Sequence, residues 1–164
     1  MARPVRTDLL RPSVLDRLLD RDNRGPGHPA IGLRELKAAV ARDLEWLLNT
    51  KSVIESSEPQ LADLPEARAS GLTYGIPDFS TASWRSLGDA HRICAELEMA
   101  VKTFEPRLLP STVRISILPT KEVDDFRMRF RIEATLYVEP VSEAVFFDSS
   151  VEFGTGAIQV EGGL

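Results

Sequence analysis

The residues best suited to chemistry lie in the stretch Phe104-Glu105-Pro106-Arg107-Leu108, where a carboxylate and a guanidinium flank a proline. Two carboxylates can act together in glycoside hydrolysis, and Asp78 is the candidate partner for Glu105. Glu105 and Arg107 can instead form a local ion pair where a helix stops, or offer charge-assisted hydrogen bonds to another protein. From the residue types alone, the local ion pair is the favoured interpretation.

The rest of the chain lacks the motifs of common enzymes. It contains no GxSxG, HExxH, CxxC or phosphate-binding loop, and Gly154-Thr155-Gly156 lacks the third glycine and the helix of a dinucleotide motif. One cysteine, Cys94, and two histidines give no ligand set, so we expect no metal and no cofactor. His91 is interpreted as a solvated residue and Cys94 as a small core residue. These observations favour a protein-binding module over an enzyme.

The composition is that of one globular domain. The chain has 164 residues, of which 43% are hydrophobic and 27% charged. No apolar run approaches about 18 residues, so we expect no membrane insertion, and the single cysteine favours the cytosol. Six arginines alternate with four aspartates in residues 1–24, whereas residues 139–164 carry five acids and no Lys or Arg. This distribution does not resemble a nucleic-acid-binding surface and suits a protein with several protein partners.

The chain divides into an arm and a domain. Ser13-Val14-Leu15-Asp16 resembles a capping box and predicts a short helix, and Asn23 to Pro29 breaks regular structure. We therefore expect an N-terminal arm over residues 1–29 and a single domain over residues 30–164.

Two segments have the spacing of amphipathic helices. The first runs from Ile31 or Gly32 to Asn49, and Trp46 lies off its apolar stripe, as either a rim residue or an interface anchor. The second runs from Ser86 or Asp89 to Phe104 and should stop before Pro106. Residues 51–86 are rich in turn formers, and within them Tyr74 to Phe79 predicts an ordered segment held on the surface.

The remaining elements alternate between apolar and polar residues, which is the pattern of half-buried strands. They are Val113 to Leu118, Phe126 to Val138, Val145 to Phe153, and Ile158 to Val160. Pro140 marks a bend and Gly154-Thr155-Gly156 a hairpin turn. The expected fold is therefore α+β, with two main helices packed on a three- to four-stranded, mostly antiparallel sheet.

Four stretches carry a resemblance to a known family: Ser13–Leu18, Arg42-Asp43-Leu44-Glu45-Trp46-Leu47-Leu48-Asn49, Tyr74-Gly75-Ile76-Pro77-Asp78 and Phe104–Leu108. In this order they resemble the small baseplate wedge proteins of type VI secretion systems and contractile phage tails. The resemblance extends from about residue 13 to the last strand. The family is often labelled lysozyme-like, so a peptidoglycan hydrolase is the alternative.

The resemblance implies a structural adaptor in a baseplate at the cytoplasmic side of the inner membrane. It would join the wedge proteins TssF and TssG and nucleate the sheath built from TssB and TssC. It also reverses the preference for a purely local ion pair. The expected partner-binding residues are then Glu105, Pro106, Arg107, Tyr74, Asp78, Trp46 and Val151.

The segment from Val145 to Val160 is the expected sheath-facing edge of the sheet. It has no Lys or Arg, although Lys on an edge strand commonly prevents pairing with other chains. The acids Glu143, just before this segment, and Asp148 and Glu152, within it, would discourage self-pairing and admit a basic partner strand. An edge of this kind is either covered by its own chain or available to a partner.

Overall fold

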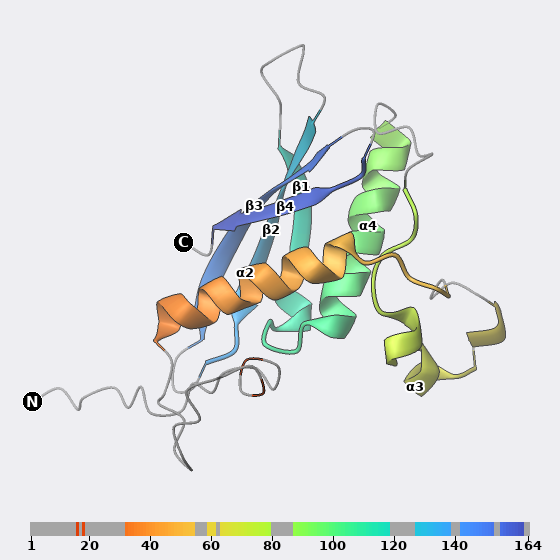
Figure 1. Ribbon diagram of the computed structural model, residues 1–164, viewed down its shortest axis with the longest axis horizontal. Coiled ribbons are helices and arrows are strands. Elements are labelled where there is room, and N and C mark those ends of the chain that lie inside the picture. The colour runs from red at the N-terminus through yellow and green to blue at the C-terminus, as the bar shows by residue number, and fades with distance from the viewer. Residues whose placement is uncertain are drawn as a thin grey trace, which may run out of the picture.

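The computed structural model describes residues 16, 18, 32–54, 59–61, 63–79, 87–118, 127–138, 142–152 and 155–162. It has the expected α+β fold, with two main helices and a four-stranded antiparallel sheet (Figure 1). The expected N-terminal arm lies outside the described residues apart from Asp16 and Leu18. The other expected positions that lie outside them are Ile31, Ser86, Phe126, Pro140, Phe153 and Gly154.

Helix α2, Leu33–Asn49, forms as its apolar period predicts. At its start the Gly32 N–H donates to Glu35 Oε2 over 2.9 Å, which satisfies a backbone donor that the helix leaves unpaired. At its end the Thr50 hydroxyl donates to the Trp46 carbonyl over 2.7 Å. The face turned to the core buries Leu36, Val40, Ala41, Leu44, Leu47 and Leu48.

Helix α4, Leu87–Phe104, is the second amphipathic helix and ends before Pro106, as expected. Cys94 is buried in it, and this burial raises the pKa of the thiol. His91 lies exposed near the start of the helix. The buried stripe comprises Ala90, Ile93, Cys94, Leu97, Ala100 and Val101.

The connection between the helices contains η1 (Pro59–Leu61), α3 (Pro65–Arg68) and η2 (Gly71–Thr73). Its last part returns to the end of α2, where the Ile76 N–H donates to the Thr50 carbonyl over 2.9 Å. Gly75 makes this approach possible, because it has φ 116° and a Cβ there would lie 2.4 Å from that carbonyl oxygen. The expected ordered segment from Tyr74 to Phe79 is thus confirmed.

The sheet is an antiparallel meander in the order β1-β2-β3-β4. Its strands are β1 (Arg114–Leu118), β2 (Arg127–Leu136), β3 (Glu143–Glu152) and β4 (Ile158–Gly162). The expected strands are confirmed with small shifts at their ends. The expected hairpin connects β3 to β4, with Gly156 at φ 69°.

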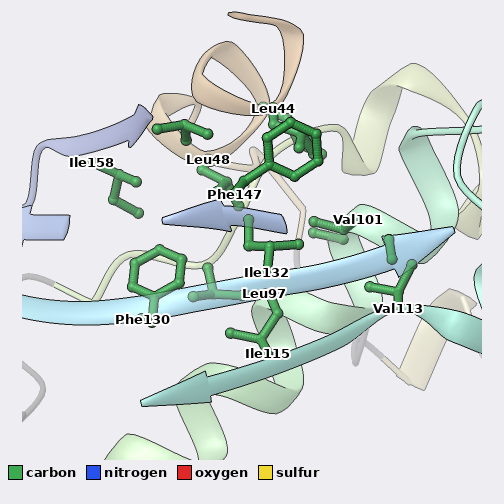
Figure 2. Packing of buried hydrophobic residues seen from close by; sticks show 14 of the residues in the cluster. Leu44, Leu48, Leu97, Val101, Val113, Ile115, Phe130, Ile132, Phe147 and Ile158 are labelled. Carbon is green, nitrogen blue, oxygen red and sulfur yellow. The ribbon is translucent and has the colours of Figure 1, made fainter. Parts of the chain in front are cut away.

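Both helices cover the same face of the sheet, α2 beside β4 and α4 beside β1 (Figure 1). The strand residues on this face are buried, and those on the opposite face are mainly polar and exposed, as is usual when only one sheet face is packed. Figure 2 shows side chains from both helices and from all four strands meeting in one apolar layer. Among them are Leu44, Leu97, Ile115, Phe130, Phe147 and Ile158.

The outer edge of β4 is covered by side chains of α2. Asn49 accepts from the Ile158 N–H over 2.9 Å and donates to the Ile158 carbonyl over 2.7 Å. Glu45 Oε2 accepts from the Val160 N–H over 3.0 Å. The β3–β4 segment is therefore covered by its own chain, and it is not the open edge expected from the sequence.

Asn49→Ala should lower the free energy of unfolding by about 1–3 kcal/mol, because the buried Ile158 loses both of its side-chain partners. Thr50→Ala removes a hydroxyl from the same helix end without affecting the strand. It should change the free energy of unfolding by less than about 0.5 kcal/mol. Urea denaturation measures both. Equal losses would contradict the role of Asn49 in covering the edge.

Candidate functional site

The candidate site begins at the corner where α4 ends. The Leu108 N–H donates to the Glu105 carbonyl over 3.1 Å, which closes a tight turn with exposed Pro106 inside it. The chain then joins the sheet, since the Arg107 carbonyl accepts from the Tyr137 N–H over 2.7 Å. Glu105 and Arg107 are thereby fixed between a helix and a strand.

The side chain of Arg107 folds back onto Glu105, and Glu105 is only 3% exposed to solvent. Glu105 Oε1 accepts from the Arg107 backbone N–H over 3.1 Å and from its Nε over 2.6 Å, and Oε2 accepts from Nη2. A buried carboxylate needs such a partner, because burial without one is strongly unfavourable. The local ion pair expected at the helix end is present.

The ion pair extends to α2 through Asp43. Arg107 Nη2 lies 2.7 Å from Asp43 Oδ2, and Asp43 Oδ1 accepts from Arg42 Nη2 over 2.7 Å. Arg42 in turn contacts Asp16, with 2.8 Å between Nη1 and Oδ1. The charged groups therefore alternate in sign along Glu105, Arg107, Asp43, Arg42 and Asp16, and they connect α2 to the corner after α4.

Two aromatic residues border this network. The Arg42 guanidinium lies 4.9 Å from the centre of the Trp46 ring, a cation–π contact, and Trp46 is 46% exposed. Tyr74 packs edge-on against Phe104, with 5.3 Å between ring centres. Burial raises the pKa of Tyr74, and the negative charges of Asp43 and Glu105 raise it further. Tyr74 therefore lies within electrostatic reach of both carboxylates.

One nitrogen of the Arg107 guanidinium is unpaired within the described part of the chain. Burial acts to lower the pKa of Arg107, but its hydrogen bonds and ion pairs with Glu105 and Asp43 raise it overall, so the group stays charged. Its Nη1 atom is buried and has no hydrogen-bond partner among the described residues. A buried donor left without a partner is unfavourable, so this nitrogen reduces the stability that the network gains from its other hydrogen bonds.

Five of the seven predicted partner-binding residues gather here: Glu105, Pro106, Arg107, Tyr74 and Trp46. Asp78 does not contact the network through any described hydrogen bond, and it pairs with Lys51 over 2.8 Å. Val151 is buried in β3 and pairs with Met128 on one side and Ile158 on the other, so it is not at a sheet edge.

Sequence reasoning missed Asp43 as the residue that connects the two helices. Asp43 belongs to the stretch Arg42–Asn49, but polar residues on an outward helix face usually contact solvent, and nothing in their spacing distinguishes it. Glu45 and Asn49 were missed for the same reason. Over the described ranges no group of three His, Cys, Asp or Glu could hold a metal, and no helix is long and apolar enough to cross a membrane.

Arg107→Ala should lower the free energy of unfolding by about 3–5 kcal/mol, because Glu105 would become an unpaired buried charge. Arg131→Ala is the control, since Arg131 forms a similar pair with Asp148 on the exposed sheet face and its loss should have a far smaller effect. Thermal and urea unfolding of both variants measure the loss of unfolding free energy. Similar losses of unfolding free energy in the two variants would contradict the argument that Arg107 is needed because Glu105 is buried.

Comparison with known proteins identifies the family. No curated protein matches the chain. A solved structure described as "The baseplate complex from the type VI secretion system" is similar with a TM-score of 0.47 and 16% identity, over 73% of this chain and 97% of that one. Residues 34–141, more than half of the chain, match the family described as "Baseplate wedge protein gp25". This chain therefore belongs to the gp25 family of baseplate wedge proteins.

Proposed function

We propose that the chain is a TssE-type structural subunit of a type VI secretion baseplate. In this role it joins the wedge proteins TssF and TssG and nucleates the sheath of TssB and TssC at the cytoplasmic side of the inner membrane. The observation that carries the proposal is the match of residues 34–141 to the baseplate wedge family. The ion network is well suited to such a role, because it orients exposed side chains without itself being a reactive centre.

The surface that we assign to the wedge partners comprises Trp46, Arg42, Tyr74 and Pro106, and is called here the wedge surface. Trp46 and Pro106 are exposed, and Arg42 and Tyr74 are partly exposed. Tryptophan, tyrosine and arginine are the residues most often found at the energetic centres of protein interfaces. The buried pair of Glu105 and Arg107 supports this surface from beneath.

A hydrolase is the weaker candidate. In glycoside hydrolysis one carboxyl group must donate a proton to the leaving group. Both oxygens of Glu105 are instead occupied by donors of Arg107, and Asp78 is paired with Lys51. These carboxylates are arranged for fixed charge pairing, which supports a structural role.

Trp46→Ala should weaken binding to the purified TssF–TssG complex by more than 10-fold. A tryptophan at the energetic centre of an interface commonly contributes about 2 kcal/mol or more to the binding free energy. The matched control is Phe146→Ala, which removes an aromatic ring of similar exposure, 44% against 46%, from the opposite sheet face. Titration calorimetry measures affinity, and thermal melting should show that both variants fold. Equal affinities of the two variants for the TssF–TssG complex would contradict the assignment of the wedge surface as the binding site.

The chain should not cleave peptidoglycan, because Glu105 and Asp78 are held in ion pairs. The turbidity of a peptidoglycan suspension with the purified protein should match that with buffer, at any pH at which the protein is folded. Loss of turbidity that Glu105→Gln abolishes would contradict the structural role and favour the hydrolase.

A further inference from the structure

Helices α2 and α4 cover one face of the sheet, and no described helix or strand covers the other, which is called here the open face (Figure 1). Successive strand residues point to opposite faces, so the charged residues that alternate with the buried ones lie on the open face. On β1 and β2 they include the basic residues Arg114, Arg129 and Arg131. On β3 and β4 they include the acidic residues Asp148, Glu152 and Glu161. One half of the open face is therefore mainly basic, and the other half is acidic.

Charge contacts within the chain leave this division in place. Arg131 pairs with Asp148 at the boundary of the two halves, with 2.6 Å between Nε and Oδ1. Glu133 is the acidic exception on β2, and it lies across from Arg114 in the strand register. Strands β3 and β4 contain no Lys or Arg at all. An excess of positive charge thus remains over β1 and β2, and an excess of negative charge over β3 and β4.

The open face also exposes two aromatic side chains. Phe146 on β3 is 44% exposed, and Tyr137, directly after β2, is 56% exposed. Both alternate with buried neighbours, so both rings project from the same side of the sheet as the charges. Aromatic side chains are enriched at the centres of protein interfaces, where they supply apolar area that charged residues lack.

A second copy of the chain has the charge pattern that fits this face. If two copies meet face to face about a two-fold axis parallel to the strands, β1 and β2 of one copy lie over β4 and β3 of the other. The basic half of each copy then faces the acidic half of its partner. A strand spacing of about 4.8 Å and a rise of about 3.3 Å per residue give roughly 500 Å² per copy, which is at the lower limit for a specific interface.

We propose that the open face is a self-association surface, through which two free copies of the chain form a weak, reversible dimer. Complementary charge sets the orientation of the copies, and the aromatic rings add apolar contact. The dimer leaves both wedge surfaces accessible, because Arg42 and Trp46 belong to α2 on the other side of the sheet. The proposal does not depend on the baseplate function.

Two double variants test the surface by giving the open face a single sign of charge. Arg114→Glu with Arg129→Glu makes both halves acidic, and Glu152→Lys with Glu161→Lys makes both halves basic. Each variant alone should dimerise at least about 10-fold more weakly than the native chain, because like charges then face each other. An equimolar mixture of the two should form a heterodimer at least as tightly as the native chain dimerises. Sedimentation equilibrium of the full chain measures these dissociation constants.

Arg34→Glu with Arg92→Glu is the matched control. It adds the same negative charge on exposed positions of α2 and α4, on the far side of the sheet, and should change the dissociation constant by less than about 2-fold. Circular dichroism shows whether each variant folds, and each is compared with the native chain separately, so one folded variant suffices. A native chain that stays monomeric up to its solubility limit would overturn the proposal. So would a folded variant that dimerises as tightly as the native chain, or a mixture of folded variants that does not associate.

Discussion

A carboxylate buried beside apolar side chains must have a cation next to it, and the corner after α4 depends on this constraint. Glu105 is almost completely buried, so Arg107 has to fold back over the turn that contains Pro106. In that position its guanidinium also reaches Asp43 on α2. One pairing requirement therefore fixes the end of α4 and its contact with α2. Through Asp43 it also orients Arg42 of the wedge surface.

The same requirement, applied to backbone groups, explains how the sheet ends. Strands at the edge of a sheet leave N–H and carbonyl groups unpaired, and each buried group left in that state is unfavourable. Each helix contributes a glutamate to the edge beside it, Glu45 to Val160 and Glu98 to Ile115. Helix α2 adds Asn49 and covers β4 more completely than α4 covers β1. Within the described residues, the packing of the helices thus determines which outward backbone groups of the sheet are satisfied.

Most of the fold could be predicted from the sequence because it depends on local periodicity. In α2 and α4 the spacing of apolar residues reports one buried face, and in β2 the strict alternation does the same. Patterns of this kind identified every main element. The site depends instead on contacts between distant residues. The pairing of Asp43 with Arg107 joins positions 64 residues apart, and no local pattern encodes it. The cover of β4 was missed for the same reason, since Asn49, which bonds to Ile158, lies on α2 and is 109 residues away from it.

The corner at Glu105 and strand β1 belong to one continuous piece of chain. The segment that begins with buried Glu105 passes through η3, Pro110–Thr112, and continues into β1. It is fixed to β2 along this course, since the Leu109 N–H donates to the Thr135 carbonyl over 2.8 Å and the Thr135 N–H donates to the Thr112 hydroxyl over 2.9 Å. This segment cannot shift along the sheet without breaking these bonds. The corner at Glu105 and strand β1 are therefore held at a constant spacing.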